Sequence, residues 1–333
     1  MPRSPDVIPG RLRRLAEELA EEGFAFEGVD QWWEPLLGEL DYALHPHVHE
    51  RRVPSFGAII QPTTDISTWE RSTGLEITVR RIDGRPLAGS RRYADGMSSW
   101  LVRREDGPDE LVVLDRAAGS ERDQVVMAAA MGATIVQRHP NGSIRVVGAF
   151  GVLRWDGVGW HHEPPITTWI DELMVDTAHG DREVVAKLLE FAVHDLGARG
   201  IGALLVYRPT EDPTPTFELR LPVPPPLEVL RPTDLAPFRH VLGQIDGAAV
   251  LDSGGTLRHL GVRLIPSPEA EAGVDGYRGM RHTAARRYSF DDPAATIIVV
   301  SEDGPVTVLR NGELLGSSNS RPVALVERPR ADD

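Results

Sequence analysis

The chain has 333 residues, a length that fits two domains of about 100–200 residues each. Its 36 basic and 50 acidic residues give a formal net charge of −14, which opposes binding to nucleic acid or to anionic membranes. The absence of cysteine excludes disulfides, a thiol nucleophile and cysteine-ligated zinc, and the single lysine, Lys187, excludes a Walker phosphate loop elsewhere in the chain.

The sequence lacks the marks of a secreted or membrane protein. Its first residues lead into an acidic amphipathic segment without the apolar core of a signal peptide. No apolar run approaches the roughly 18 residues that a membrane-spanning helix needs. We therefore expect a soluble, cytoplasmic protein.

The first half of the chain predicts a strand-rich α+β domain over residues 1–170. Leu12, Leu15 and Leu19 share one helical face, and Gly23 follows where a helix cap would lie. Residues 24–170 then indicate mostly short strands separated by turn signals such as Asn141-Gly142. The predicted strands are 56–61, 75–82, 98–103, 110–114, 134–137 and 144–147.

The second half has the texture of an α/β domain over residues 171–318, with a frayed tail at 319–333. An apolar face predicts a helix over 181–196, and the continuous apolar run 201–207 is typical of a strand buried on both faces. The nine prolines within 209–237 predict an extended loop rather than a helix or a central strand. Further elements are expected at 235–242 and 281–288 (helices), and at 247–252, 258–264, 296–301 and 306–310 (strands).

Two stretches of the sequence resemble each other. Residues 133–142 (ATIVQRHPNG) and 295–304 (ATIIVVSEDG) both run from an Ala-Thr-Ile start into a strand and a turn. The similarity is compatible with an internal duplication, but any strand–turn–strand unit can look like this.

A histidine cluster offers one route to metal chemistry. In an extended segment, alternation puts His45, His47 and His49 on one side, and imidazole is a common transition-metal ligand. His161 and His162 are candidates to complete such a site. A metal-dependent hydrolase is therefore one hypothesis, and a polar loop or strand face is the other reading.

Polar residues at the ends of predicted buried elements point to a different site. Asp246 lies at the start of a predicted buried strand, and a bound hard metal ion would explain a carboxylate at this position. Arg281 and His282 open a helix, where backbone N–H groups and the helix dipole already favour a phosphate. Ser301 and Glu302 end another strand and add a hydroxyl and a second carboxylate.

Small residues beside Asp246 add to this pattern, because Gly247 and Ala248 let a large group approach the backbone. A metal–nucleotide site at strand ends and a helix N-terminus is therefore predicted.

At these residues the sequence resembles the diadenylate cyclase family of the DisA N-terminal type, whose domain makes cyclic di-AMP from two ATP. The family's markers are an Asp-Gly-Ala motif and an Arg-His-Arg motif, preceded by a helix and a Gly-Ala-Leu-x-Val strand. Their counterparts here are Asp246-Gly247-Ala248, Arg281-His282-Thr283 and Gly202-Ala203-Leu204-Leu205-Val206. The resemblance covers roughly residues 175–316. The ~165 residues in front of it resemble the sensor domains that precede some soluble cyclases.

The resemblance implies a mixed central sheet flanked by helices, and a domain that binds one ATP and meets a second domain face to face in a homodimer or larger homo-oligomer. It implies Mg²⁺ or Mn²⁺ held by Asp246 and Glu302, with Asp246 also helping to activate the attacking hydroxyl. Asp246, Arg281 and His282 are then the catalytic residues. The nucleotide-binding residues implied are Gly202, Ala203, Leu204, Gly247, Ala248, Gly279, Met280, Thr283 and Ser301.

The sequence departs from the family pattern at Thr283, where the second arginine of Arg-His-Arg is expected. Losing one charge-assisted phosphate contact costs about 1.5–3 kcal/mol, which slows a reaction rather than abolishing it. Two hypotheses follow. The chain is a diadenylate cyclase regulated by its N-terminal domain, or a weak or inactive sensor that binds a nucleotide or cyclic dinucleotide.

Overall fold

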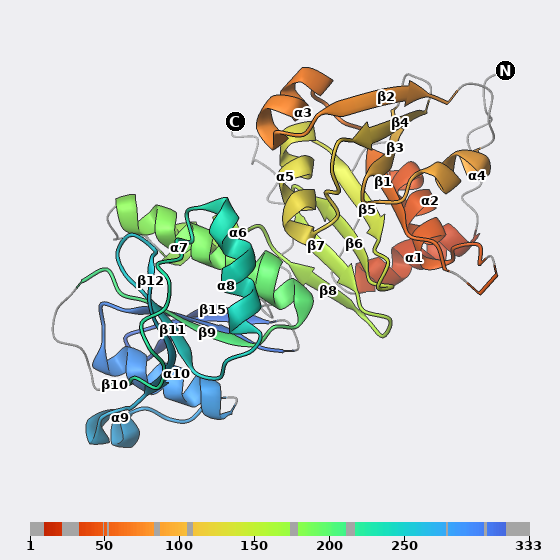
Figure 1. Ribbon diagram of the computed structural model, residues 1–333. Helices are drawn as coiled ribbons and strands as arrows, with labels where there is room; N and C mark the ends of the chain where they lie inside the picture. The colour runs from red at the N-terminus through yellow and green to blue at the C-terminus, as the bar shows by residue number, and fades with distance from the viewer. Residues whose placement is uncertain are drawn as a thin grey trace, which may run out of the picture. The chain divides into compact units, whose positions relative to one another are not determined.

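The computed structural model describes residues 10–21, 33–48, 50–51, 53–82, 87–104, 109–173, 179–210, 217–277, 279–302 and 305–317. The chain divides into two compact units, with the division between Pro165 and Ile166 (Figure 1). We call them unit 1 and unit 2 and describe each by itself. The predicted tail at 319–333, Gly23 and His49 lie outside the described residues.

Unit 1 is a mixed sheet covered by helices on both faces. The strand order is β2-β4-β3-β1-β5-β6-β7-β8, and β1 and β3 form a parallel pair whereas the other neighbours are antiparallel. The strands are β1 (Phe56–Ile60), β2 (Ile77–Arg81), β3 (Ser99–Arg103), β4 (Glu110–Leu114), β5 (Thr134–Arg138), β6 (Ile144–Gly148), β7 (Gly151–Trp155) and β8 (Trp160–Glu163). The helices are α1 (Gly10–Glu21), α2 (Trp33–Leu44), α3 (Ile66–Thr73), α4 (Leu87–Ser90) and α5 (Glu121–Met131), and a 3₁₀ turn spans Arg91–Tyr93.

Two apolar layers hold unit 1 together. Leucines of α1 and α2, such as Leu19 and Leu40, pack on one face of the sheet with Val136. Helices α3 and α5 pack on the other face, where Trp69 and Met127 are buried with the side chains of alternate strand residues.

The six strands predicted in the first half are present, but the expectation of mostly strands and turns over 24–170 missed α2, α3, α5, β7 and β8. Helix α5 shows why. It buries Glu121 and Gln124 on the same side as Met127, so its inward face does not form an apolar stripe.

Unit 2 is a second mixed sheet, with the order β10-β12-β11-β9-β13-β14-β15. The strands are β9 (Ala203–Tyr207), β10 (Phe217–Glu218), β11 (Ala248–Leu251), β12 (Leu257–Leu264), β13 (Thr296–Val300), β14 (Val306–Arg310) and β15 (Glu313–Ser317). The helices are α6 (Ile166–Leu173), α7 (His179–Phe191), α8 (Leu235–Leu242), α9 (Pro268–Gly273) and α10 (Met280–Asp291). A π-helical turn (Ala192–Leu196) and a 3₁₀ turn (Gly197–Arg199) follow α7, and a 3₁₀ turn (Pro232–Asp234) precedes α8.

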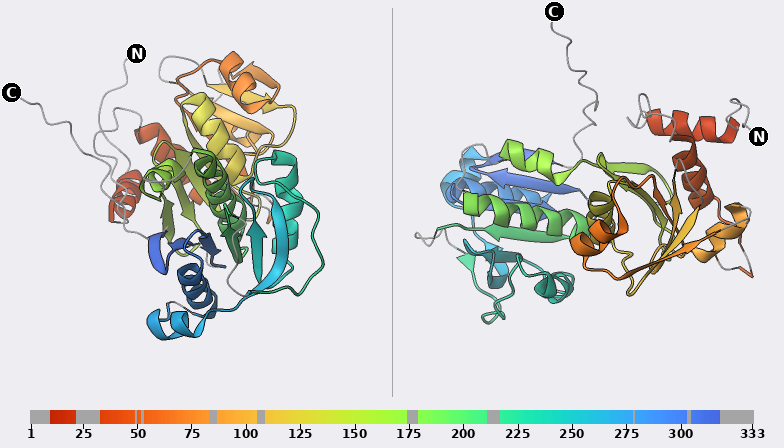
Figure 2. Two further views of the ribbon diagram at one scale, coloured as in Figure 1. Left: turned by 90° about the vertical axis from the view of Figure 1, so that its left-hand side faces the viewer. Right: turned by 90° about the horizontal axis from the view of Figure 1, so that it is seen from above.

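The helices of unit 2 cover opposite faces of its sheet, as the two views of Figure 2 show. Leu188 of α7 and Phe238 of α8 are buried with Ile298 on one face. Ala285 and Tyr288 of α10 are buried with Ile297 on the other. Successive residues of β13 therefore pack into opposite layers, and all of them are apolar or buried, as in a strand that is covered on both sides.

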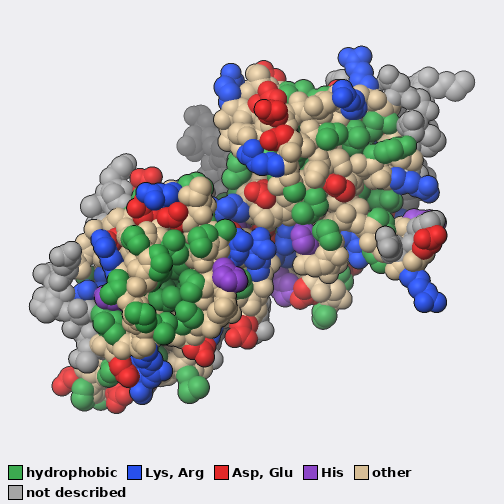
Figure 3. Space-filling model, in the orientation of Figure 1, with side chains coloured by type: hydrophobic (Ala, Val, Ile, Leu, Met, Phe, Trp, Pro, Cys, Tyr) green, Lys and Arg blue, Asp and Glu red, His purple; other side chains and the backbone are tan. Residues whose placement is uncertain are grey.

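The proline-rich segment differs from expectation at its end. Pro237 lies inside α8, where it is tolerated because the first helical turn needs no N–H donor at that position. Leu219, Leu221 and Val223 of this segment are exposed apolar side chains, and Figure 3 shows hydrophobic side chains gathered on the visible face of unit 2. Helices α6 and α9 and strands β10 and β15 were not predicted.

Candidate functional site

The strand directions of unit 2 bring three distant segments to one edge of the sheet. Strands β9 and β11 are parallel, with Leu204 beside Ala248, so both begin at this edge. Strand β13 is antiparallel to β9, with Val300 beside Ala203, so it ends at the same edge. The sheet therefore collects Gly202 before β9, Asp246 before β11, and Ser301 with Glu302 after β13.

Gly202 lies in contact with two of the predicted charged residues. A Cβ atom built on Gly202 would lie 2.5 Å from Arg281 Nη1 and 2.9 Å from Glu302 Cγ. Only glycine fits between these side chains without displacing them. Arg281 at the start of α10 and Glu302 at the end of β13 therefore meet at the start of β9, as the site hypothesis requires.

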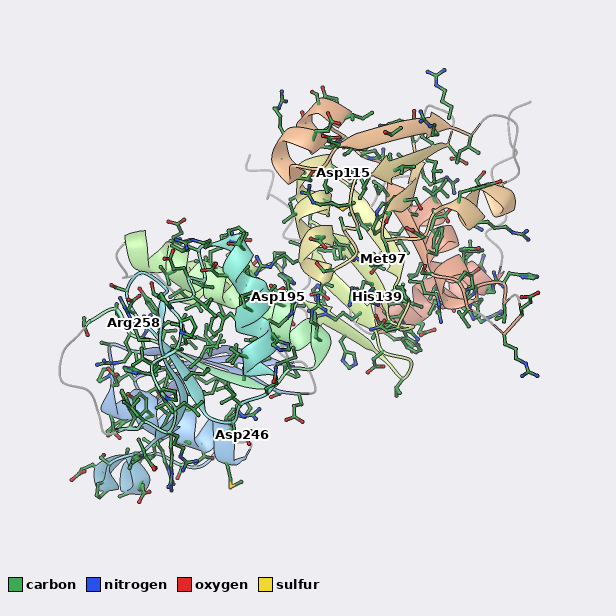
Figure 4. All side chains as sticks on the ribbon, in the orientation of Figure 1. Met97, Asp115, His139, Asp195, Asp246 and Arg258 are labelled. Atoms are coloured by element: carbon green, nitrogen blue, oxygen red, sulfur yellow. The ribbon has the colours of Figure 1, made fainter. Side chains whose placement is uncertain are left out.

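The Asp-Gly-Ala segment forms a tight entry to β11. Gly247 has φ +106°, and a Cβ there would lie 2.7 Å from the carbonyl carbon of Gly261, so the position requires glycine. Ala248 is fully buried, whereas the Asp246 side chain is exposed. Figure 4 shows Asp246 at the margin of unit 2.

The first turn of α10 has the properties of an anion site. It contains no acidic residue, and Gly279 provides no side-chain cap, so no side chain caps the first backbone N–H groups of the helix. Arg281 is exposed, Met280 is 92% exposed, and His282 is 8% exposed. The rings of Tyr277 and His282 meet edge to face, with centroids 5.9 Å apart.

Thr283 is engaged by the loop that precedes α10. Its hydroxyl accepts a hydrogen bond from the Tyr277 backbone N–H at 3.0 Å and donates one to the Tyr277 carbonyl at 3.2 Å. The hydroxyl proton is thus used within the protein, so the neutral phosphate contact expected of Thr283 competes with this hydrogen bond. Sequence reasoning missed Tyr277, whose only signal was an aromatic side chain between two glycine-containing turns.

The remaining predicted residues divide between the faces of the sheet. Leu204 and Ala248 are buried in the layer beneath α10, whereas the Ala203 side chain packs in the opposite layer, with α7 and α8. Only its backbone can therefore face a ligand on the α10 side. Ser301 is half-buried, and its N–H donates to the Pro305 carbonyl at 2.9 Å, which closes the turn that presents Glu302.

The charged groups of this edge are not used by the fold. Within the described residues, Asp246, Arg281 and Glu302 form no ion pair with one another or with another side chain. The same part of the chain contains no group of three or more His, Asp or Glu residues placed to hold a metal ion. Two exposed carboxylates nonetheless suit Mg²⁺, which proteins commonly bind through one or two carboxylates together with substrate phosphates.

The histidines of unit 1 have separate partners. His45 contacts Asp41 at 3.2 Å, and His47 is exposed. His161 pairs with Asp156, whose pKa is held to about 2 by the Gly159 and Val158 backbone N–H groups and by His161. The ring of His162 contacts the Phe150 carbonyl at 2.9 Å. The described residues therefore do not assemble the metal centre of the hydrolase hypothesis, and we do not carry it forward.

The described residues include no helix long and apolar enough to cross a membrane. No curated protein matches the chain. One solved structure similar to part of it is "The crystal structure of the hypothetical membrane spanning protein from Bacillus cereus", which is 22% identical, with a TM-score of 0.30, over 40% of this chain and 70% of that one.

Two family models match successive parts of the chain. Residues 13–163 match the model described as "Probable sensor domain DACNK". Residues 190–314 match the model described as "DisA bacterial checkpoint controller nucleotide-binding", the diadenylate cyclase (DAC) family, and this match spans the sheet edge that holds Gly202, Asp246, Arg281 and Glu302. By these matches the chain contains a probable sensor domain of the DACNK type followed by a DAC nucleotide-binding domain.

Proposed function

We propose that unit 2 binds ATP at the edge formed by β9, β11, β13 and the start of α10, and condenses two ATP into cyclic di-AMP and two pyrophosphates. The observation that carries this proposal is the meeting of Gly202, Arg281 and Glu302, which come from three segments far apart in the sequence. These charged groups make no ion pair within the described residues, so folding alone does not explain why they gather.

The phosphates belong at the start of α10. Its first N–H groups lack a side-chain cap, its first turn carries no acid, and Arg281 adds a guanidinium that suits phosphate oxygens. His282 is buried against Tyr277, which holds its ring in one orientation beside this helix end. The adjacent Gly202 keeps the approach to Arg281 open.

Asp246 and Glu302 are the residues that would hold Mg²⁺ or Mn²⁺. When bound, such an ion neutralises charge on the triphosphate and on the departing pyrophosphate. The carboxylate of Asp246 would also accept a hydrogen bond from the attacking 3′-hydroxyl and so orient it. Gly247 and Ala248 keep this part of the backbone accessible to the nucleotide.

The reaction needs two copies of the chain. In each half, the 3′-oxygen of one ATP forms a bond to the α-phosphorus of the other, the bond to the β-phosphate oxygen breaks, and pyrophosphate leaves. One unit 2 holds one ATP, so a partner unit must present the second, and the active state is a homodimer or a larger assembly. Positioning and charge neutralisation supply most of the catalysis. Unit 1 then regulates how often two copies meet productively.

A second candidate function is a nucleotide- or cyclic-dinucleotide-binding sensor without turnover. The observation that favours it is the Thr283 hydroxyl, which is committed to Tyr277 and replaces the second arginine of the family motif. Binding would then persist through α10 and Arg281, while the weaker phosphate grip would leave the transition state under-stabilised.

The test incubates the purified full chain with ATP and Mg²⁺ or Mn²⁺ and measures cyclic di-AMP by mass spectrometry. We expect product from the wild-type chain and a loss of at least 100-fold in Asp246→Asn, because the amide neither holds the metal nor orients the hydroxyl. Glu313→Gln, an exposed carboxylate change on β15, serves as the matched control and should leave the rate unchanged. Bound ATP without product supports the sensor instead, and full activity in Asp246→Asn would place the site elsewhere.

A further inference from the structure

The two units share one strand connectivity. Near the centre of each sheet two strands are parallel, β1 with β3 in unit 1 and β9 with β11 in unit 2. The other neighbour of β1 is β5 and that of β9 is β13, and both of these pairs are antiparallel. Every remaining neighbour in unit 2 also has an antiparallel counterpart in unit 1. The equivalent strands are β1 and β9, β2 and β10, β3 and β11, β4 and β12, β5 and β13, β6 and β14, and β7 and β15, with β8 additional.

The last three strands correspond residue for residue. Strands β13, β14 and β15 each begin and end 162 residues after β5, β6 and β7, at 296, 306 and 313 against 134, 144 and 151. The similar stretches 133–142 and 295–304 lie at the start of this region and have the same offset. A chance strand–turn–strand similarity would not also reproduce the strand order, the directions and the loop lengths.

The helices occupy equivalent places as well. Helix α5 packs over Ile135 of β5, and α10 packs over Ile297 at the same position of β13. On the opposite faces, α2 packs over Val136 and α7 over Ile298. Helices α5 and α10 precede β5 and β13 in the chain, and helices α2 and α7 precede β1 and β9. The match therefore extends from the sheets to these helices.

The two cores differ at one pair of neighbouring strand positions, where a small and a large side chain have changed places. Because β1 and β9 both pair over five residues with β5 and β13, Gly57 corresponds to Leu204 and Trp100 to Ala248. A Cβ on Gly57 would lie 2.5 Å from the Trp100 ring, so this indole fills the space of a missing side chain. In unit 1 a buried tryptophan thus stands where unit 2 has the small alanine of its Asp-Gly-Ala motif.

The helix starts differ in charge. Helix α5 begins with Glu121 and Asp123, and a reciprocal capping box between Ser120 and Asp123 uses its first N–H donors. The Glu121 side chain is fully buried and receives two hydrogen bonds from Arg154, at 2.6 and 2.7 Å. The first turn of α10 has no acid and no side-chain cap.

The strands beneath these helix starts also differ in charge. Arg145 and Arg154 of unit 1 reach the Glu121 carboxylate, Arg145 at 3.6 Å. With the offset of 162 residues, their counterparts in unit 2 are Thr307 and Gly316, and a register shift between β14 and β15 places Ser317 opposite Thr307. Glu163 is a second buried carboxylate of this cluster, 3.5 Å from Arg154. Unit 1 therefore carries two arginines and two carboxylates where unit 2 has small side chains at the positions of the arginines.

From these contacts we infer that the chain contains two copies of one fold, and that the N-terminal copy has closed its phosphate position with its own Glu121 carboxylate, held by Arg145 and Arg154. The chain then has a single nucleotide site, in unit 2, and unit 1 is a copy that does not bind nucleotide. The duplication rests on the two sheets, and the closed position rests on the contacts of Glu121 in unit 1. The equivalence to a phosphate position in unit 2, and the stoichiometry below, rest on the proposed function.

The first test removes the carboxylate. Glu121→Ala leaves Arg145 and Arg154 beside a helix start with Glu163 as the remaining carboxylate, 3.5 Å from Arg154. We expect its Tm to fall by about 5–10 °C and to recover by at least half in inorganic phosphate or pyrophosphate. Glu39→Ala is the matched control, because Glu39 is equally buried between Arg91 and Arg103 but lies within α2 rather than at a helix start. No recovery in Glu121→Ala, or equal recovery in both variants, overturns the closed phosphate position.

The second test needs no folded variant of unit 1. Calorimetric titration of the wild-type full chain with a non-hydrolysable ATP analogue should give one site per chain, and Arg281→Ala should weaken that site at least tenfold. Two sites per chain, or a second saturable site that persists in Arg281→Ala, would overturn the single-site inference. If the wild-type chain binds no analogue, the proposed function fails, and phosphate recovery in Glu121→Ala still decides the inference about unit 1.

Discussion

The Thr283 hydroxyl and the Tyr277 backbone exchange two hydrogen bonds, one accepted at 3.0 Å and one donated at 3.2 Å. This exchange ties the loop before α10 to the second residue after Arg281, and it places the Tyr277 ring against His282. The position where the resemblance implies a second arginine is thus used here to hold a loop. Thr283 thus holds the backbone of Tyr277, whose ring contacts His282.

Thr283→Val removes both hydrogen bonds and keeps the shape of the side chain. Each bond contributes about 0.5–1.5 kcal/mol, so we expect nucleotide affinity to fall roughly 5- to 150-fold as the Tyr277 loop loosens. Thr283→Ser retains the hydroxyl and should retain the affinity. Calorimetry with an ATP analogue measures both, and equal affinities for the valine and wild-type chains would show that the loop does not position the site.

Thr283→Arg tests whether the missing guanidinium limits turnover. Arginine also breaks the exchange with Tyr277, so the informative comparison is with Thr283→Val rather than with wild type. A charge-assisted phosphate contact of about 1.5–3 kcal/mol predicts a kcat about 10- to 100-fold higher in the arginine than in the valine variant. Equal rates of cyclic di-AMP formation would mean that residue 283 does not reach the phosphates.

Gly202→Ala places a methyl group among the site residues without altering any charge. The new Cβ would lie 2.5 Å from Arg281 Nη1 and 2.9 Å from Glu302 Cγ, so both flexible side chains must move. We expect at least a tenfold loss of nucleotide affinity with a Tm within about 3 °C of wild type. Gly273→Ala, at the end of α9 where nothing lies within 4 Å of the new atom, is the control. Unchanged affinity in Gly202→Ala would contradict the proposed phosphate position.

His162 predicts a pH dependence of stability. Burial lowers its pKa from the ordinary value of 6.5, although its contact with the Phe150 carbonyl opposes the shift. The folded state therefore binds its proton less readily than the unfolded state, so this stability is present above about pH 6.5 and is lost as the pH falls below it. The fall in Tm between pH 7.5 and 5.5 should be smaller in His162→Gln than in wild type. His161→Gln, at the exposed neighbouring position, should behave as wild type does.

Much of the local structure could be predicted because it is encoded by near neighbours in the sequence. The continuous apolar run of β9 predicts a buried strand, and the Asn141-Gly142 pair predicts the turn between β5 and β6. Helix α5 could not be found in this way, because its buried face holds Glu121 and Gln124, whose partners lie on other elements or in its own cap. The apolar periodicity of this helix is interrupted by polar residues whose hydrogen-bond partners are supplied only in the folded chain.

The candidate site shows the same division. Asp246, Arg281 and Glu302 could be singled out from the sequence, since each charged group stands at the predicted end of a strand or helix. The meeting of Arg281 and Glu302 at Gly202, the hydrogen bonds of Thr283 to Tyr277 and the ion pair of Glu121 with Arg154 could not, because they depend on strand order and register. The sequence by itself determined many of the elements and the chemistry at their ends, whereas tertiary packing alone decided which ends meet. Contacts between residues tens of positions apart leave no local periodicity to read.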